Sequence, residues 1–433
     1  MSKIIKQSAL LEEKERTVKQ LKETLAQAEQ AAQAMREETK TALLKEEAKR
    51  LLIFNEFQKL RKDIRVMCRI RPSSAKDGPV LGYETSEGTF HSKPAGLEIV
   101  TNKRKLGTSE LVEDRTRHYN FDRVFEAQET NADVWHEIGQ FVQSFVEGRK
   151  VTIFCYGQTA TGKTYTMSNT DRAVDANGEP VLTNEGIIPR ARSLIFEEAA
   201  KRREKGWTVT VRGCCYEVYV KDIRLLLPER NVKTKTLDPT GPPWWRVRQP
   251  EYRELHSAAD FDDMFDGAME SRTFAETTSN SNSSRSHFIL YLEFDTKSPT
   301  MKNPLKGSLC LVDLAGSEDP HKASAVEEGR DAEKARTRLR EGIAINQSLR
   351  VLRKSISKIR NPGANGKPTL EGGDEESSTL AKLLGPCLGR DSMVLMFVMI
   401  NLAADCLPET KATLESGREV SAASIARIPV GAG

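Results

Sequence analysis

The sequence has few of the features that would mark a secreted, membrane or metal-bound protein. Its seven cysteines are scattered apart from the adjacent Cys214 and Cys215, and they form neither a CxxC pair nor a disulfide framework. The six histidines show no zinc-binding spacing. Apolar runs such as Met393 to Ile400 are far shorter than the roughly 20 residues that span a bilayer. We therefore expect no membrane segment and reduced, buried thiols.

The amino terminus also lacks an apolar signal-peptide core, which predicts a protein of the cytosol or nucleus. A strong net charge is missing as well, because the formal charge is only +4 over 433 residues. The total charge therefore neither favours nor excludes a polyanionic partner, and local clusters must decide. A composition of 38% hydrophobic and 30% charged residues excludes a chain that is disordered throughout.

Glycine and proline are absent from residues 1–71, where strong helix formers occupy most positions. Apolar residues recur every seven positions, with others three positions further on, as in the seam of a coiled coil. The members of this seam are Ile4, Leu11, Val18, Leu25 and Ala32, with Leu21, Ala28 and Met35. Gln7 and Lys14 interrupt it. The pattern predicts a coiled-coil helix, and a single solvated helix is the alternative.

The pattern changes at Ile64, where IRVMCRIRP is typical of a strand that ends at Pro72. Further on, short apolar segments alternate with helical patterns, and several are apolar on both faces, as in strands covered by helices on each side. These strand candidates are residues 151–156, 208–211, 288–294, 308–314 and 394–400. We expect an α/β sandwich with surface loops at residues 171–184, 228–250, 319–336 and 361–378.

These boundaries predict four parts along the chain. They are a coiled-coil helix at residues 1–60, a junction at 61–63, a globular domain at 64–425 and a tail at 426–433.

One predicted strand, VTIFCY, runs directly into a complete GxxxxGK[ST] segment. Glycines let successive backbone N–H groups converge on phosphate oxygens, and a following helix directs its positive end toward them. Lys163 would neutralise the β- and γ-phosphates of a nucleotide, and the Thr164 hydroxyl would bind Mg²⁺. A glycine-rich turn without a nucleotide is the alternative. The segment comprises Gly157, Gln158, Thr159, Ala160, Thr161, Gly162, Lys163 and Thr164.

Two further segments could complete such a site. Asp313 ends the apolar strand LCLVDL, where its carboxylate can hold Mg²⁺ through water. The hydroxyl-rich residues 280–287 precede the strand FILYLEF and suit a loop that senses a terminal phosphate. Taken alone, they suit an ordinary polar turn equally well.

The three segments together resemble one known family. GQTATGKTYTM, NSNSSRSH and LVDLAGSE occur in the order and approximate spacing of the P-loop, switch I and switch II of kinesin motor domains. Weaker likenesses lie between and around them, namely RIRP, GIIPR, EVYVKDIRLL and LREGIAINQSL. The resemblance implies a P-loop NTPase kinesin motor fold, α/β with a central mixed sheet flanked by helices, preceded here by the coiled-coil helix.

The resemblance also implies an adenine site. Arg69, Arg71 and Pro72 would form a platform for the base, and Tyr165 would stack on it from the other side. The bound ligands would be ATP and Mg²⁺.

The two switches are assigned catalytic roles by the same resemblance. Ser284 would approach Mg²⁺, and Ser283 would approach the attacking water. Gly316 would sense the γ-phosphate through its N–H group. Arg285 and Glu318 would pair when ATP is bound, and this latch would make hydrolysis depend on conformation.

The partner implied by the resemblance is the microtubule, whose tubulin surface is acidic. A basic cluster brackets the sequence INQSL and would attract an acidic partner, although a solvated helical face is the alternative. Its members are Lys334, Arg336, Arg338, Arg340, Arg350, Arg353, Lys354, Lys358 and Arg360. Nucleic acid is a poorer partner, because no aromatic-interleaved basic patch accompanies the cluster.

The order of coiled coil, junction and motor resembles the carboxy-terminal-motor kinesins, which move toward microtubule minus ends. It implies a homodimer, or a heterodimer with a related chain, located in the cytoplasm and cytoskeleton, with spindle and nucleus as further candidates. Some positions depart from the family pattern: Lys62 replaces a small glycine, and Gln347 replaces the Lys of INKSL. The acidic stretch at residues 371–376 replaces a basic one and predicts weaker binding to an acidic track.

Three function classes follow from these observations. The first is a kinesin ATPase that moves along or crosslinks microtubules. The second is a dimeric microtubule-binding protein with slow or absent ATP turnover, and the third is an unrelated P-loop ATPase. The complete P-loop and switch motifs favour the first class.

Overall fold

The computed structural model describes residues 2–60, 64–75, 77–86, 95–104, 111–174, 180–226, 235–237, 252–279, 283–299, 303–322, 332–360, 378–389 and 392–425. These residues belong to two units, one formed by the amino-terminal helix and the other by the segments from the first strand onward. The predicted junction at 61–63, the tail at 426–433 and the acidic stretch at 371–376 lie outside the described residues.

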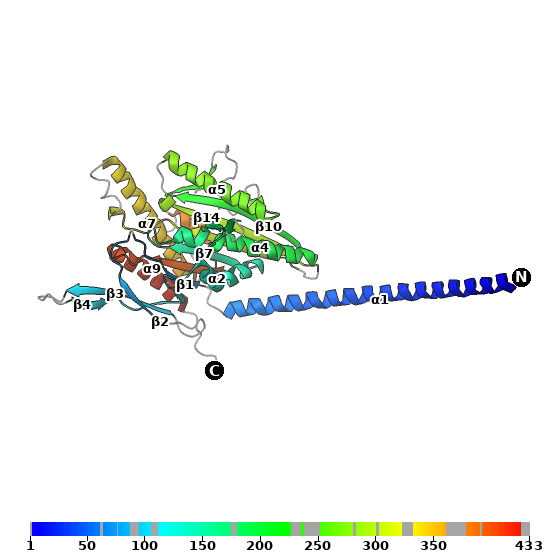
Figure 1. Cartoon of the computed structure of the whole chain (residues 1–433). Helices are drawn as coiled ribbons and strands as arrows, with labels where there is room; N and C mark the ends of the chain where they lie inside the picture. Colours follow the sequence, from blue (N-terminus) through cyan, green and yellow to red (C-terminus); the bar gives the residue numbers. More distant parts are fainter. Residues whose placement is uncertain are drawn as a thin grey trace. The chain divides into compact units, whose positions relative to one another are not determined.

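The helices and strands follow one another as Figure 1 shows. The helices are α1 (Ser2–Leu60), α2 (Asn131–Val146), α3 (Lys163–Ser168), α4 (Ile187–Glu204), α5 (Ala258–Ser279), α7 (Ala332–Arg360), α8 (Thr379–Leu384) and α9 (Leu407–Ile425). The 3-10 helices are η1 (Ser283–Arg285), η2 (Gly385–Leu388) and η3 (Ala404–Cys406).

The strands before α5 are β1 (Ile64–Ile70), β2 (Gly82–Ser86), β3 (Ala95–Arg104), β4 (Leu111–Arg115), β5 (Tyr119–Phe121), β6 (Arg123–Phe125), β7 (Lys150–Tyr156), β8 (Arg172–Val174), β9 (Pro180–Leu182), β10 (Thr208–Tyr219), β11 (Asp222–Leu226), β12 (Lys235–Leu237) and β13 (Arg253–Glu254). The strands after it are β14 (Ser286–Lys297), β15 (Leu305–Asp313) and β16 (Ser392–Ile400).

The first unit is the single helix α1, which has 59 residues and contains neither glycine nor proline. At 1.5 Å per residue such a helix is roughly 90 Å long. Its apolar seam lies on the surface, with Leu11, Leu21 and Met35 exposed by 62%, 64% and 71%. The predicted helix is confirmed, whereas its pairing in a coiled coil stays a prediction.

The second unit is built around a mixed sheet with the strand order β12-β11-β10-β14-β15-β7-β16-β1-β6, and β13 pairs with β10. β7 lies between β15 and β16 and is parallel to both, whereas β14 and β10 are antiparallel additions. The predicted central mixed sheet is therefore confirmed. In a sheet of this kind, loops at the carboxyl ends of parallel strands meet at one edge.

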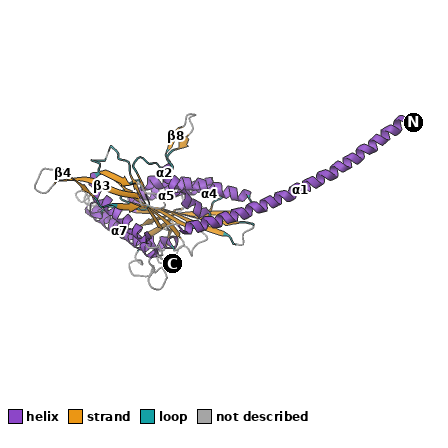
Figure 2. Ribbon diagram, turned by 90° about the horizontal axis from the view of Figure 1, so that it is seen from below, coloured by secondary structure: helices purple, strands orange, loops and turns teal. Residues whose placement is uncertain are grey.

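Helices cover both faces of this sheet. α2 packs against α4, β7 and β15, while α9 packs against α7, β16 and β1. Figure 2 shows α2, α4 and α5 gathered on one side of the strands and α7 on the other. All nine residues of β16 are buried, because both faces of this strand are covered. The apolar runs of the sequence thus predict the central strands correctly.

Two predicted loops differ from the structure. β8 and β9 form a small antiparallel ribbon inside the segment expected to be a loop at 171–184. The loop expected at 319–336 ends early, because α7 begins at Ala332 with the strong helix formers AEKAR. The other two expected loops lie mostly outside the described residues. A separate antiparallel sheet of β2, β3, β4 and β5 was not predicted from the sequence.

The cysteines are free thiols, and all are buried except Cys406, which is half-buried. Burial raises the pKa of the Cys68 and Cys155 thiols well above the ordinary value. The expectation of reduced, buried thiols is confirmed apart from Cys406. Among the described helices, none combines the length and apolar character that crossing a membrane requires.

Candidate functional site

The glycine-rich segment connects β7 to α3 and needs glycine at two positions. Gly162 has a φ of 89°, in the left-handed region where side chains are rarely accommodated. A Cβ atom on Gly157 would lie 2.2 Å from the Met399 carbonyl oxygen of β16, so the backbone could not approach the sheet. The close strand-to-helix turn predicted from the motif is therefore present.

Lys163 begins α3 and is only 8% exposed. Its Nζ donates to the carbonyl oxygens of Gly157 and Gln158, at 3.0 and 2.8 Å. Burial lowers the pKa of Lys163, whereas the charges of Asp313 and Glu318 oppose that shift. The loop thus holds a cation at its centre with only carbonyl groups as direct partners, as a phosphate site requires.

Thr164 and Asp313 meet at the end of β15. The Thr164 hydroxyl donates to Asp313 Oδ2 at 2.6 Å. The other oxygen, Asp313 Oδ1, is buried and has no hydrogen-bond partner among the described residues. A hydroxyl beside a carboxylate with one unsatisfied oxygen is a donor set that Mg²⁺ prefers. Two of the three residues that the sequence predicted for Mg²⁺, Thr164 and Asp313, therefore lie together and fit the ion, and the role of Ser284 stays a prediction.

The remaining loop residues complete the turn. Ala160 has a φ of 63°, and the Thr161 hydroxyl donates to the Gln158 carbonyl at 2.8 Å. Gln158 Nε2 donates to the Cys406 thiol at 3.2 Å. These contacts fix the loop against η3.

Backbone hydrogen bonds bring the two switch segments to the P-loop. The Gly316 N–H donates to the Ser284 carbonyl at 2.8 Å, and the Ser317 N–H donates to the Gly157 carbonyl at 3.2 Å. Segments more than a hundred residues apart in the sequence thus converge on one edge of the sheet. Ser283 lies in η1, and its side chain is outside the described part of the structure.

Glu318 lies against the P-loop. Its carboxylate accepts the Thr159 N–H at 2.8 Å and the Thr159 hydroxyl at 2.7 Å. Gly316 makes room for it, because a Cβ atom on Gly316 would lie 2.1 Å from Glu318 Oε2. A carboxylate therefore takes two donors of the loop expected to bind phosphate.

Arg285 pairs with a residue that the sequence did not single out. Its guanidinium donates to Glu341 Oε2 of α7 at 3.0 Å, and the Tyr219 hydroxyl donates to Glu341 Oε1 at 2.6 Å. Burial and the Glu341 carboxylate raise the pKa of Tyr219 to about 12. Arg285 and Glu318 therefore have different partners here, and their pairing stays a prediction for the ATP-bound protein.

The residues predicted for the adenine site also have partners within the protein. Arg69 is 5% exposed and donates to Asn131 Oδ1 and the Thr166 hydroxyl, each at 2.6 Å. Its guanidinium lies 5.9 Å from the centre of the Tyr165 ring, which is a direct cation–π contact. Arg69 is therefore held by neighbouring side chains and contacts the half-exposed Tyr165 ring.

Arg71 and Pro72, the other two members of the expected platform, directly follow β1. The Arg71 guanidinium pairs with Asp77, and backbone hydrogen bonding from Ser74 holds the pKa of that carboxyl below its usual range. Pro72 is exposed. Of the platform, Tyr165 and Pro72 present surface to a base, whereas both guanidinium groups are engaged within the protein.

His287 links switch II to α7 and was not assigned a role from the sequence. Its Nδ1 accepts the Ala315 N–H at 3.0 Å, and its Nε2 lies 3.4 Å from the Ser348 hydroxyl. Burial, followed by the positive charges of Arg272 and Lys163, lowers the pKa of His287 to about 3. The ring is therefore neutral and acts as a fixed connection between strand end and helix.

This neutral, buried histidine predicts a pH dependence of stability. The pKa of His287 is about 3 in the folded protein, and an unfolded histidine titrates near 6.5. Protons therefore bind the unfolded chain first, so His287 costs stability as the pH falls below about 6.5. We expect this one residue to lower the free energy of unfolding by about 2 kcal/mol between pH 7 and pH 5.

Urea unfolding at the two pH values checks this expectation. The variant His287→Gln should show a smaller loss of stability between pH 7 and pH 5 than the parent. Equal losses in both proteins would contradict the assignment.

The basic cluster predicted on α7 divides into outward and inward residues. Arg340, Arg350 and Lys354 are exposed. Arg353 instead donates to the Ser416 hydroxyl of α9 and lies over the Tyr156 ring at 5.9 Å. Arg353 is therefore engaged with α9, and its part in a microtubule contact stays a prediction. The side chains of Lys358 and Arg360 are outside the described part.

Comparison with known proteins agrees with the motifs. A family model described as the kinesin motor domain matches residues 69–422. The chain is 32% identical to Kinesin-like protein klpA of Emericella nidulans over 414 residues, which are 92% of this chain and 48% of the relative. It is 31% identical to Kinesin-like protein KAR3 of Saccharomyces cerevisiae over 436 residues, which are 96% of this chain and 53% of the relative.

A solved structure is also similar, namely the C-terminal motor and motor homology domain of Kar3Vik1 fused to a synthetic heterodimeric coiled coil. It has a TM-score of 0.72 and 28% sequence identity, and it covers 95% of this chain and 99% of that one. The chain thus spans about half the length of the curated relatives it matches.

Proposed function

The chain belongs to the kinesin family, and from this premise we propose that it is a microtubule-stimulated ATPase that moves along or crosslinks microtubules. The observation that carries the proposal is the convergence of the two switch segments on the P-loop. Gly316 bonds to Ser284, Ser317 bonds to Gly157, and Glu318 bonds to Thr159. Loss of the terminal phosphate from the nucleotide would therefore alter the positions of both switches.

ATP and Mg²⁺ would be bound by the residues that fit them. Lys163 would neutralise the phosphate chain, and the glycine-rich backbone would donate N–H groups to its oxygens. Thr164 and Asp313 would hold Mg²⁺, which neutralises charge that develops on the terminal phosphate. Ser284 would approach Mg²⁺ and Ser283 would approach the attacking water, in the roles that the resemblance implies.

The carboxylate of Glu318 supports a switching step. A terminal phosphate and Glu318 are both anions that would compete for the donors of Thr159. Binding of ATP would therefore expel Glu318 from Thr159 and leave it available to Arg285. Arg285 would exchange Glu341 for Glu318, and the latch would form only with the triphosphate present.

Helix α7 would carry this change to the surface. Asn346 Nδ2 donates to the Glu318 carbonyl at 2.9 Å, so α7 is bonded directly to switch II. Glu341 and Ser348 lie on the same helix and contact Arg285 and His287. A rigid helix held at three points would shift when switch II shifts.

The outer side of α7 would contact the microtubule. Exposed residues recur at alternating spacings of four and three, which forms one stripe along the helix. The stripe consists of Arg336, Arg340, Ile343, Gln347, Arg350 and Lys354. Ile343 is 48% exposed within this basic surface, so an acidic partner with a small apolar patch would fit it.

Charge reversal on this stripe is expected to weaken microtubule binding. In the variant Arg340→Glu, the microtubule concentration that gives half-maximal ATPase should rise about tenfold at low salt, because attraction becomes repulsion. The rate without microtubules should stay the same. The matched control is Lys201→Glu, at an exposed position of α4. Equal behaviour of the two variants in steady-state ATPase would exclude α7 as the contact.

We propose minus-end-directed movement and a cytoskeletal location, as the likeness to carboxy-terminal-motor kinesins implies. Microtubule gliding over surface-bound protein, with polarity-marked microtubules, tests the direction. Movement toward the plus end would refute it. Helix α1 would form one strand of a two-stranded coiled coil with an identical or related chain, and the exposed seam supports this arrangement.

A further inference from the structure

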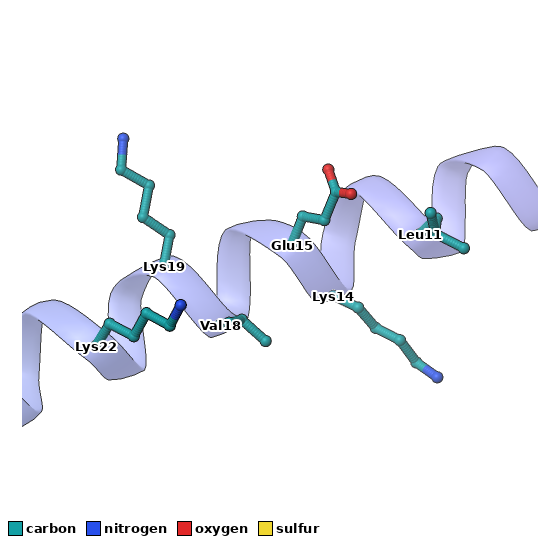
Figure 3. Close-up of a pocket in the computed structure, with 6 residues that line it drawn as sticks. All are labelled: Leu11, Lys14, Glu15, Val18, Lys19 and Lys22. Carbon is teal, nitrogen blue, oxygen red and sulfur yellow. The ribbon is translucent and has the colours of Figure 1, made fainter.

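Charged side chains on α1 and on α7 lie in different surroundings. The charged residues drawn in Figure 3 are exposed and project from a single helix, and α1 alone lines the shallow depression among them. Arg353 of α7 differs from them, because its side chain is only 21% exposed and turns toward the neighbouring helix α9. A guanidinium group stays ionised at any ordinary pH, so a largely buried one needs partners that are fixed in place.

Arg353 is held by a hydroxyl, a carboxylate and an aromatic ring. Its guanidinium donates to the Ser416 hydroxyl and to Glu419 Oε2, the latter at 3.4 Å. It also lies 5.9 Å from the centre of the Tyr156 ring. Ser416 and Glu419 belong to α9, whereas Tyr156 is the last residue of β7. One side chain of α7 therefore reaches both a helix and the strand that leads into the P-loop.

The Ser416 hydroxyl is the centre of this network. It donates to the Ala412 carbonyl within α9 at 2.8 Å, so its oxygen can only accept from other groups. The Tyr156 hydroxyl lies 3.3 Å from it and is therefore the donor of that contact. The two lone pairs of the Ser416 oxygen thus accept from Arg353 and Tyr156. Ser416 and Tyr156 are 3% and 6% exposed, so water has little access to this contact.

The two elements that hold Arg353 are parts of the packed core. α9 lies against β1, β5 and β16, and its residues Leu414 and Val420 are completely buried. β7 is paired with β15 on one side and with β16 on the other. Close-packed elements of this kind move little relative to one another. The network therefore ties the carboxyl-terminal half of α7 to a fixed point.

The contacts between α7 and the switches lie nearer the amino-terminal end of the helix. They are made by Glu341, Asn346 and Ser348. Arg353 follows Ser348 by five residues, which is roughly 7.5 Å along a helix. A rigid helix that is pinned at one point and displaced at others rotates about the pinned point. The largest displacement would then occur at the amino-terminal end of the exposed basic stripe.

We propose that Arg353 is a positioning residue, the pivot about which α7 tilts when the switches move. The inference rests on the function proposed above and adds the residue that turns a switch movement into rotation of the microtubule-binding stripe. Without this pivot, the switches could move without tilting α7, and the nucleotide would have less influence on microtubule binding. Coupling between two binding sites is reciprocal, so it is measured as the change that one ligand makes in the affinity for the other.

Microtubule affinity in two nucleotide states tests the proposal. Sedimentation with microtubules gives the dissociation constant of the full chain with ADP and with a non-hydrolysable ATP analogue, and the ratio of the two constants measures the coupling. We expect Arg353→Met to bring this ratio about fivefold closer to one, since methionine fills similar space but donates no hydrogen bond. The matched control is Arg350→Met, at an exposed arginine of the same helix, which should weaken binding in both states and keep the ratio.

A second variant shows whether the contact with α9 is responsible. Ser416→Ala removes the acceptor and keeps Arg353, so it should bring the ratio closer to one to a similar extent. The double variant should lose no more coupling than either single variant, because both changes remove the same contact. Losses that add in the double variant would overturn this contact as the pivot. Thermal unfolding of each protein shows whether its fold is retained.

The outcomes separate the pivot from the proposed function. A ratio of one in the parent protein would mean that nucleotide and microtubule are not coupled, which overturns the proposed function and the pivot with it. A parent ratio different from one that Arg353→Met leaves unchanged overturns the pivot alone. A loss of affinity of equal size in both states, as expected for Arg350→Met, would show that Arg353 is a microtubule contact instead.

Discussion

Replacing Lys163 by alanine is expected to reduce the steady-state rate of ATP turnover about a thousand-fold. Lys163 is 8% exposed, and its ammonium group donates to two carbonyl groups of the P-loop. Lys163 is the only cationic residue of this loop, so no other residue of the loop can supply its charge. Its loss removes the cation that would neutralise the phosphate chain as charge develops. Turnover measured by phosphate release, with and without microtubules, checks the result.

A matched control for this variant is Lys201→Ala. Lys201 is an exposed lysine of α4 that pairs with Glu198 on the same helix. This variant should keep the parent rate. Thermal unfolding of both variants shows whether the fold is retained. If Lys163→Ala kept more than about a tenth of the parent rate, the phosphate role of this lysine would be wrong.

Replacing Gly316 by alanine is expected to lower turnover about a hundred-fold while leaving ATP binding within a few-fold of the parent. The added Cβ would lie 2.1 Å from Glu318 Oε2 and 2.3 Å from the Thr159 hydroxyl. Both atoms are ends of side chains that can rotate away, so the fold should survive. The added methyl group would lie between Gly316 and the P-loop, so the Gly316 N–H group could not approach the terminal phosphate and the switching step would fail.

Binding of a fluorescent ATP analogue and steady-state turnover separate the two effects in this variant. The matched control is Gly78→Ala, because a Cβ atom at Gly78 would meet nothing within 4 Å. Turnover of Gly316→Ala within about threefold of the parent would show that Gly316 and Glu318 do not act as described.

Local features of the site could be predicted from the sequence. The turn at Gly157 and Gly162 follows from the strand, loop and helix that are adjacent in the chain. The meeting of Thr164 with Asp313 follows from the parallel pairing of β7 and β15, which brings their carboxyl ends together. The apolar runs of β7, β15 and β16 predict the centre of the sheet, because strands covered on both faces are apolar along their whole length.

Contacts made by helix packing could not be predicted in this way. Glu341 reaches Arg285 from 56 positions away, and Ser348 lies 61 positions from His287. The packing of α7 against its neighbours α9, α8, η1 and η2 decides which residues of this helix face the switches. Arg353 shows the same limit, since its inward direction depends on the neighbouring helix α9. Its basic side chain gives no sign of this in the sequence.

The short strands β2 to β5 were not predicted because their apolar pattern is weak. They are three to ten residues long, and β2 carries the polar sequence GYETS, so their apolar pattern is weak. Their pairing is set by register with β3, as where Glu84 of β2 pairs with Glu98. A sheet held this way leaves little trace in hydrophobic periodicity.

The central claim is that hydrolysis at Lys163 is coupled to a surface that binds microtubules. Its most direct test is the steady-state ATP turnover of the full chain, measured with and without saturating microtubules. The account predicts that the rate of ATP turnover is clearly higher with microtubules than without them. A rate that microtubules leave unchanged would contradict it.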